Sequence, residues 1–145
     1  MKCVLQRVNN ASVEVCGKVV GKIGKGILVL VGFSKDFNND KMDFMVRKIK
    51  SFRLWASEEK GFDLDVCDIN GEILVVSQFT LFGKCDKGTK PNFVKSLGAA
   101  EAEPLYEKFV SKLKEEGLKV STGRFGAYMK VNLENDGPVT IVLEK

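Results

Sequence analysis

The sequence predicts an α+β fold: a largely antiparallel, barrel-like β-sheet with two packed helices, in a single domain that spans residues 1–145. Short segments rich in Val and Ile are separated by turns that contain Gly or Asn, which is typical of an antiparallel sheet. Two longer segments, near residues 40–52 and 103–117, have apolar side chains at helical spacing. A chain of 145 residues is long enough to form one domain around a hydrophobic core.

The amino-terminal third is expected to form an antiparallel meander. Its strands are predicted over residues 2–7, 12–15, 18–23 and 27–33. Residues 8–11 are expected to form a bend or bulge, and Cys16-Gly17 a turn. Gly24-Lys25-Gly26 separates the last two of these strands.

Asn39 or Asp40 is expected to cap the first helix, because either side chain can accept a hydrogen bond from a free backbone N–H group at its start. Its apolar residues fall on one helical face: Met42, Met45, Val46 and Ile49. The helix is expected to end near Ser51 or Phe52, and residues 53–55 are expected to form a short strand.

Residues 73–81 are predicted to form a buried strand that follows a tight hairpin turn at Asn70-Gly71. The second helix is predicted from an apolar stripe of Leu105, Phe109, Val110 and Leu113. Since Pro104 lacks a backbone donor, regular helix is expected to begin only near Glu103, and Gly117 is expected to end it.

The last three strands are predicted over residues 119–122, 128–133 and 139–143, with residues 134–137 joining the final two. Gly137-Pro138 at this junction has two interpretations. Spacing alone indicates a plain hairpin turn, yet a Gly-Pro bond can also be cis, which directs the neighbouring carbonyl oxygens differently. Arg124 lies in another Gly-bracketed turn, where an Arg is more often a solvated surface residue than a ligand contact.

Composition limits the chemistry that the chain can perform. Without histidine, it has neither a Ser-His or Cys-His nucleophile arrangement nor a histidine-based metal site. Its four cysteines form no CxxC pair, so we expect free thiols and neither a metal nor another cofactor. Nowhere do 18 apolar residues run together, so we expect a cytoplasmic protein with no membrane partner. The net charge of +4 is compatible with a nucleic-acid partner and with none.

The polar end of the run at residues 73–81 is the first candidate site. Ser77, Gln78 and Thr80 place two hydroxyls and an amide where an apolar strand ends, and each would cost about 1–3 kcal/mol if it were buried unpaired. These groups are either satisfied by the backbone or form part of a binding site. A basic, turn-forming loop at residues 84–91 follows, and its charge suits an anionic ligand.

Four stretches together resemble the signature motifs of the D-aminoacyl-tRNA deacylases, the D-tyrosyl-tRNA deacylase family. They are residues 77–81 (SQFTL), 87–93 (KGTKPNF), 123–127 (GRFGA) and 135–140 (NDGPVT). The opening residues 4–8 and the turn at residues 24–26 also match in the same order, so the resemblance covers nearly the whole chain. Each motif is weak alone, but all of them in register are specific. Lys90 departs from the pattern, since Arg is more often expected there.

The resemblance implies a homodimeric hydrolase that cleaves the ester between a D-amino acid and the 3′ end of tRNA. In that family the Gly-Pro pair is cis and enters the pocket of the partner subunit. The carbonyls of Gly137 and Pro138 would then meet the α-ammonium group and block the side where an L side chain would lie. Val139 and Thr140 complete this substrate-binding motif. The opposite, catalytic wall would consist of Ser77, Gln78, Phe79 and Thr80.

Two mechanisms remain open for such a site. Either Thr80 attacks with the help of a Lys, or the protein positions the ester while the 2′-hydroxyl of the substrate relays the proton. The second is favoured, because the sequence places neither a His nor a carboxylate beside Thr80. Backbone N–H groups of Phe79 and Thr80, with the Gln78 amide, would then stabilise the oxyanion. The tRNA phosphates would be bound by Lys84, Lys87, Lys90 and Arg124.

Two functions without catalysis compete with this one. A dimeric RNA-binding module would use the same basic loop to bind phosphates, and a dimeric scaffold would use the Gly-Pro turn to lock its subunits. The chain has 10 Phe but 1 Trp and 2 Tyr, mostly on apolar faces, which does not favour a base-stacking platform. Only the deacylase would turn over tRNA that carries a D-amino acid or glycine.

Overall fold

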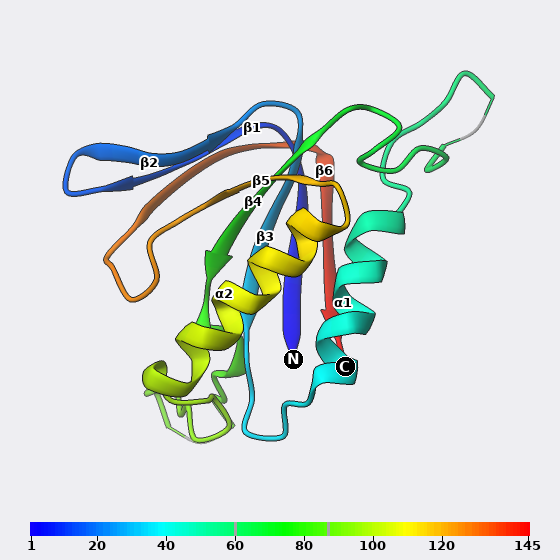
Figure 1. Ribbon diagram of the computed structural model, residues 1–145. Coiled ribbons are helices and arrows are strands. Elements are labelled where there is room, and N and C mark those ends of the chain that lie inside the picture. Colours follow the sequence, from blue (N-terminus) through cyan, green and yellow to red (C-terminus); the bar gives the residue numbers. More distant parts are fainter. Residues whose placement is uncertain (60, 87) are drawn as a thin grey trace.

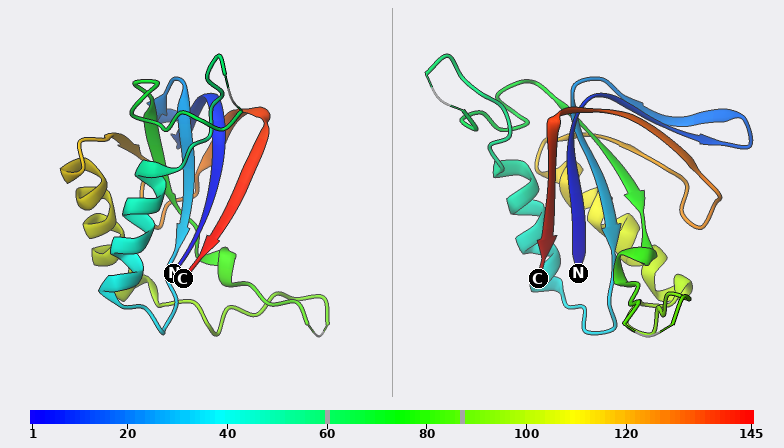
Figure 2. Two further views of the ribbon diagram at one scale, coloured as in Figure 1. Left: turned by 90° about the vertical axis from the view of Figure 1, so that its right-hand side faces the viewer. Right: turned by 180° about the vertical axis from the view of Figure 1, so that it is seen from behind.

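In the computed structural model, which describes residues 1–59, 61–86 and 88–145, six strands form one sheet and two α-helices cover one of its faces (Figures 1 and 2). The strands are β1 (Lys2–Val15), β2 (Lys18–Ile23), β3 (Gly26–Gly32), β4 (Glu72–Ser77), β5 (Lys119–Thr122) and β6 (Lys130–Glu144). The helices are α1 (Asn39–Ser51), α2 (Ala99–Glu115) and the short 3₁₀ helix η1 (Phe79–Phe82). The predicted α+β fold is therefore confirmed.

β1 is the strand on which the sheet is built. Along one edge its first half pairs with β3 and its second half with β2, while β6 runs along its other edge, all three antiparallel. β4 and β5 then extend the sheet from β3 in parallel. The predicted meander is wrong, because β2 and β3 each pair with β1 instead of with each other. The predicted bulge near residues 8–11 is confirmed by register shifts against β6 on both sides of Val8.

The sheet curls until its two ends nearly meet, which makes it barrel-like. β2 approaches β5, and the Ser121 hydroxyl donates to the carbonyl of Lys22 at 3.1 Å. Gly21 permits this approach, since a Cβ there would lie 2.2 Å from the carbonyl oxygen of Thr122. This approach covers part of the edge that β2 and β5 would otherwise present.

Two hydrophobic clusters lie on the two faces of the curled sheet. The larger cluster packs α1 and α2 against the sheet, with Met45 and Phe109 of the helices against strand residues such as Val29. The smaller cluster, which includes Val13 and Leu74, fills the inside of the curl. None of the helices formed by the described residues is long and apolar enough to cross a membrane.

Both helix starts differ from the prediction. Asn38, not Asn39 or Asp40, caps α1, because its Oδ1 accepts the N–H of Lys41 at 3.0 Å. α2 begins at Ala99, four residues before the predicted start, with Pro104 inside it. Pro104 is exposed and removes one hydrogen bond in the second turn, and the burial of Ala102 and Tyr106 on either side compensates for that loss. Gly117 ends the helix with φ +83°, as predicted.

Several predicted strands and turns also differ. Residues 53–55 form no strand, and Trp55 makes only an isolated bridge to Leu64. The turn at Asn70-Gly71 exists, with Asn70 at φ +52°, but it leads into a parallel strand and is not a hairpin. The two strands predicted after residue 128 are one strand, β6, so Gly137-Pro138 is not a hairpin turn. β1 is long enough to pair with β6 along its whole length, which keeps the chain extended through this segment.

We predict that Gly21→Ala destabilises the protein by about 1–3 kcal/mol, because a methyl group would overlap a backbone carbonyl at the closure of the sheet. Urea unfolding measures the change. Gly24→Ala is the matched control, since its Cβ would meet only Glu72 Oε2, at an ordinary 3.6 Å. Equal stability of the two variants would contradict the closure argument.

Candidate functional site

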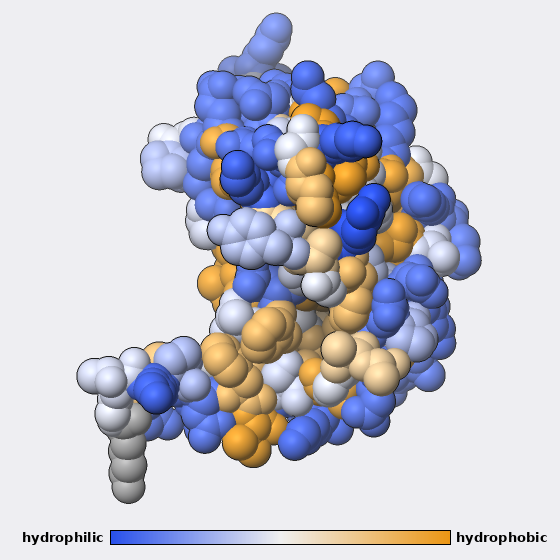
Figure 3. All heavy atoms as spheres, turned by 90° about the vertical axis from the view of Figure 1, so that its left-hand side faces the viewer, coloured by the Kyte–Doolittle hydropathy of each residue, from blue (hydrophilic) through white to orange (hydrophobic). Residues whose placement is uncertain are grey.

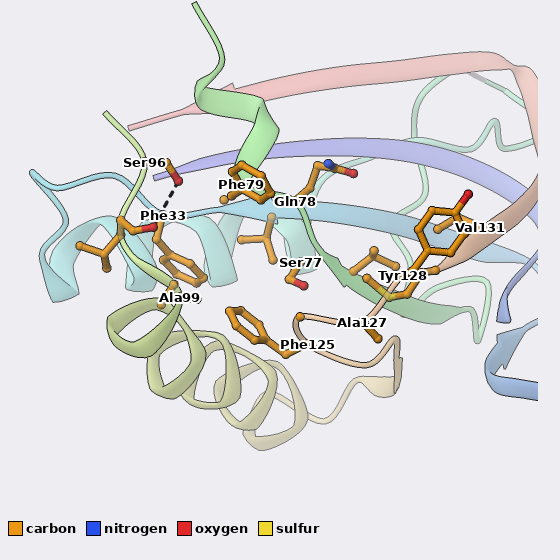
Figure 4. Close-up of a pocket in the computed structure, with 17 residues that line it drawn as sticks. Phe33, Ser77, Gln78, Phe79, Ser96, Ala99, Phe125, Ala127, Tyr128 and Val131 are labelled. Carbon is orange, nitrogen blue, oxygen red and sulfur yellow. Dashed lines mark hydrogen bonds between the residues drawn. The ribbon is translucent and has the colours of Figure 1, made fainter. Parts of the chain in front are cut away.

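A cavity of about 500 Å³ opens at the carboxyl end of β4. Its walls come from the ends of β3 and β4, the start of η1, residues 96–97, the first turn of α2 and the loop after β5. Figure 3 shows a hollow on this side of the molecule, with hydrophobic residues gathered around it. Figure 4 shows Ser77 and Phe125 on facing walls, with Phe79 above Ser77 and Tyr128 to its right.

The lining of this cavity is neutral. Its polar side chains are Ser77, Gln78, Ser96 and Tyr128. Among the described residues, no carboxylate, lysine, arginine or cysteine lines it. In the same part of the chain, no cluster of three or more Cys, Asp or Glu side chains is arranged to hold a metal ion. The cavity can therefore bind and orient a substrate, but it offers no side chain that exchanges a proton near neutral pH.

The wall behind the cavity is fixed by a buried tyrosine. Tyr106 of α2 donates its hydroxyl to the carbonyl of Val75 at 2.9 Å. Burial raises the pKa of this hydroxyl well above its usual range, so it stays protonated. Its ring lies 5.6 Å from that of Phe125, between ring centres, and holds the loop after β5 against α2. The helix and this loop thus form one rigid side of the cavity.

The polar residues at the end of β4 lie at the mouth of the cavity. β4 ends at Ser77, four residues earlier than predicted, and Gln78 still donates its N–H to Val31 at 2.7 Å. The chain then turns into η1, and the Gln78 side-chain amide donates to the Thr80 hydroxyl. Ser77, Gln78 and Phe79 line the cavity, whereas Thr80 is exposed and lies outside the lining.

The first N–H groups of η1 are free to bind a ligand. Those of Phe79 and Thr80 precede the first bond of the 3₁₀ helix, and within the described chain they have no hydrogen-bond partner. The Phe79 side chain is 57% exposed and packs edge-on against Phe93, with ring centres 5.0 Å apart. An exposed aromatic ring and unpaired donors therefore stand together at the rim of the cavity.

The Gly137-Pro138 bond is cis, and the segment that contains it bulges from β6. Thr140 pairs with Gln6 and Asn135 with Val8, so four residues of β6 lie opposite a single residue of β1. Asn135 stabilises the bulge from within, because its Oδ1 accepts the Val139 N–H at 3.1 Å and its Nδ2 donates to the Thr140 hydroxyl at 2.9 Å. Gly137 and Pro138 are exposed at its tip.

Arg7 supports this bulge from β1, and our reasoning from sequence did not single out this side chain. Its Nε donates to the carbonyl of Asp136 at 3.0 Å and lies 3.2 Å from a carboxylate oxygen of the same residue. Another guanidinium nitrogen donates to the carbonyl of Leu54. An arginine within an apolar strand pattern was the available signal, since a half-buried cation needs partners.

One chain does not bring the two predicted walls together. Ser77 is level with Val31 and Cys3 in the sheet, whereas the bulge is level with Arg7, three strands away from β4. The offset is four residues along the strands, or about 13 Å, and about 14 Å across them. The Gly137-Pro138 tip is therefore remote from the cavity of its own chain.

Three of the four predicted phosphate-binding cations lie on described surface loops. Lys84, Lys90 and Arg124 are all exposed. Lys84 is 3.7 Å from Asp86, between Nζ and Oδ2, and Arg124 precedes the lining residue Phe125. Lys87 lies outside the described residues.

Comparison with known proteins gives a family. A family model described as D-Tyr-tRNA(Tyr) deacylase matches residues 4–144. The chain belongs to this deacylase family. Relatives named D-aminoacyl-tRNA deacylase include those of Thermosipho melanesiensis, 49% identical over 99% of this chain and 97% of the relative, and Clostridium perfringens, 48% identical at the same coverage. Membership in the deacylase family confirms the resemblance and the expectation of an enzyme of this type.

Two solved structures share the deacylase fold. One, described as c-Myc DNA Unwinding Element Binding Protein, is 44% identical with a TM-score of 0.93 and covers 100% of this chain and 99% of its own. The other, described as a probable eukaryotic D-amino acid tRNA deacylase, has a TM-score of 0.85 over 98% of this chain and 97% of its own. Its identity is 20%, so it supports the fold alone.

We predict that Arg7→Lys lowers the free energy of unfolding by about 1.5–3 kcal/mol, because one ammonium group cannot serve both the Asp136 and Leu54 carbonyls. Urea unfolding measures the loss. Arg53→Lys is the control: its side chain is 64% exposed beside Asp63, so the change should stay within about 0.5 kcal/mol. Similar losses in both variants would refute a supporting role for Arg7.

Proposed function

We propose that this protein hydrolyses the ester bond between a D-amino acid and the 3′ end of tRNA, releasing both, and that it serves chiral proofreading in the cytoplasm. The observation that carries the proposal is the neutral cavity, because the family signature Ser77-Gln78-Phe79 forms part of its wall. Its volume of about 500 Å³ is in the range that holds small organic ligands, so it can accept an aminoacyl group with its ribose.

The active unit in this proposal is a homodimer in which each chain completes the cavity of the other. Gly137 and Pro138 are exposed and distant from their own cavity, which fits a role across an interface. A row of paired apolar residues, Val142, Val4, Leu30 and Val76, runs across the face of the sheet that the helices leave open. Val76 lines the cavity and Val142 is 61% exposed, so a partner on this row would adjoin the cavity.

Selection of the D form would be steric. The carbonyls of Gly137 and Pro138, presented by the partner within the motif that continues to Val139 and Thr140, would accept hydrogen bonds from the α-ammonium group. They would also occupy the space where an L side chain must project. Arg7 and Asn135 hold the bulge in place, so the wall cannot recede to admit that side chain. Rejection would thus depend on backbone atoms.

Catalysis in this proposal is assisted by the substrate. The described lining offers no general base, so the 2′-hydroxyl of the terminal ribose would relay the proton. The free N–H groups of Phe79 and Thr80, together with the Gln78 amide, would stabilise the oxyanion. The alternative, attack by Thr80, requires a base, and the Thr80 hydroxyl instead accepts a hydrogen bond from Gln78.

The rest of the tRNA would lie against the basic loops. Lys84, Lys87, Lys90 and Arg124 would contact phosphates and supply affinity, not choice of amino acid. A second candidate function is a dimeric RNA-binding module without catalysis. It is favoured by Tyr128, which is 87% exposed at the cavity and offers a surface for base stacking. Such a module would bind tRNA without turnover.

The mechanism is tested with Thr80→Ala and with a D-aminoacyl-tRNA that ends in 2′-deoxyadenosine. Because Thr80 lies outside the cavity lining, the variant should retain activity within about tenfold, whereas the deoxy substrate should be hydrolysed poorly. Single-turnover rates on both substrates give the comparison. An inactive variant together with normal cleavage of the deoxy substrate would exclude the substrate-assisted route.

Steric selection makes a further prediction. Glycine has no side chain to clash with the carbonyl wall, so the protein should hydrolyse glycyl-tRNA as well as D-aminoacyl-tRNA, while L-aminoacyl-tRNA survives. Deacylation of matched D-alanyl-, L-alanyl- and glycyl-tRNA at equal enzyme concentration is the measurement. Intact glycyl-tRNA beside cleaved D-alanyl-tRNA, or equal cleavage of both alanyl forms, would contradict exclusion by the wall.

A further inference from the structure

A second cavity, of about 600 Å³, lies on the other side of η1 and is distinct in character from the first. We call it the lysine groove. Five lysines line it: Lys2, Lys35, Lys84, Lys95 and Lys145. Two carboxylates, those of Asp36 and Glu144, also line it. It lies at the end of the sheet where both ends of the described chain meet (Figures 1 and 2), and the amino group of Met1 donates to the carbonyl of Lys145 at 2.8 Å.

The lysine groove and the neutral cavity are lined by neighbouring residues of the same three segments. Phe79 faces the neutral cavity while Phe82, at the other end of η1, lines the groove. Phe33 and Leu97 line the first, and the adjoining Lys35 and Lys95 line the second. A ligand that extended from the neutral cavity across η1 or across these two segments would therefore reach the groove.

Backbone hydrogen bonds fix two of the lysines side by side. The N–H of Lys35 donates to the carbonyl of Lys95 at 3.1 Å, and the N–H of Leu97 donates to that of Phe33 at 2.9 Å. These bonds use only main-chain atoms, so both ammonium groups remain available to a ligand. Within the described chain, neither Lys35 nor Lys95 forms an ion pair.

The two carboxylates of the groove already have partners. Asp36 is bound by Lys41, 2.5 Å away between Oδ2 and Nζ, and Glu144 lies 3.2 Å from the Nζ of Lys2. The Lys41 contact holds the pKa of Asp36 well below its usual range, so the carboxylate stays ionised and paired. The charge left without a partner is therefore positive, and it comes from Lys35 and Lys95, since the Nζ of Lys145 lies 5.2 Å from the centre of the Phe44 ring.

We infer that the lysine groove binds the sugar-phosphate backbone of the RNA whose 3′ end occupies the neutral cavity. This inference rests on the proposed function for the identity of the ligand. Flexible ammonium groups on an open surface suit phosphates as point charges and carry no base specificity. The neutral cavity would hold the aminoacyl ester and its ribose, and the groove would hold phosphates that precede them in the chain. Lys35 and Lys95 supply its central contacts.

The test compares Lys35→Gln/Lys95→Gln with Lys18→Gln/Lys22→Gln, which removes the same charge from exposed lysines of β2, at the far end of the molecule (Figure 1). Fluorescence anisotropy measures binding of uncharged tRNA between 50 and 200 mM KCl. Each lost phosphate contact should reduce the magnitude of the salt slope of log affinity by about 0.7–0.9. The slope of the groove variant should therefore be smaller in magnitude by about 1.4–1.8, and the control should keep the wild-type slope. Thermal unfolding confirms that both variants are folded.

A second measurement separates this inference from the proposed function. On D-aminoacyl-tRNA the groove variant should show a raised KM with kcat nearly unchanged, and on a D-aminoacyl ester of adenosine, which has no phosphate, it should equal wild type. An unchanged salt slope in the groove variant, or an equal reduction of the slope in both double variants, would overturn the inference that the groove binds phosphates. This holds even if the wild type is an active deacylase. Absence of wild-type deacylation would overturn the proposed function, while a reduced slope in the groove variant alone would still support phosphate binding there.

Discussion

The pairing of β1 with three other strands is the constraint on which the rest of the structure depends. One strand of 14 residues provides both the partner of β3, which leads to the cavity, and the partner of β6, which carries Gly137-Pro138. The register shifts around Val8 divide β1 into two halves, and they fall where β6 bulges outward. Arg7 lies in the same stretch, and its guanidinium group donates hydrogen bonds to the carbonyls of Asp136 in the bulge and of Leu54. The geometry of the exposed carbonyl wall is thus set by the strand that organises the sheet.

The end of β4 shows how the site follows from the chain. Val75 and Val76 are buried, so their backbone groups must pair within the sheet, whereas Phe79 and Thr80, which follow the last sheet bond at Gln78, leave it and expose their N–H groups. η1 begins there because the chain turns sharply, and a 3₁₀ helix leaves its first N–H groups unpaired. Free donors at the rim of an apolar cavity are thus a consequence of how the strand ends.

Much of the fold could be predicted from local sequence, and the errors have identifiable physical causes. The apolar stripe of Met42, Met45 and Ile49 predicted α1 correctly, because helical periodicity is local. The cap was displaced by one residue because Asn38, Asn39 and Asp40 have similar capping chemistry. Strand neighbours were harder to predict. Whether β2 pairs with β1 or β3, and whether residues 134–137 reverse the chain, depends on long-range pairing that no local pattern encodes.

The candidate site was predictable in composition and less so in arrangement. Ser77, Gln78 and Phe79 were identified from a polar strand end and a family motif, and the structure places all three in the wall of one cavity. Thr80 belongs to the same motif but is exposed and does not line the cavity, because η1 winds with about three residues per turn and successive side chains diverge. Arg7, Lys35 and Lys95 could not be selected, since their roles depend on neighbours more than 45 residues away in sequence.

In the proposed function, the two cavities would divide substrate recognition by charge. The one at Ser77 is neutral, so its interactions with an ester depend on the shape and direction of hydrogen-bond donors, which salt hardly affects. The groove at Lys35 and Lys95 is positive and open, so its interactions depend on charge and weaken as ions screen it. In the proposed function, η1 forms a wall of both, so contacts with phosphates on one side would bring the ester to the donors on the other. Affinity and choice of amino acid would then reside in different residues, and each could change without altering the other.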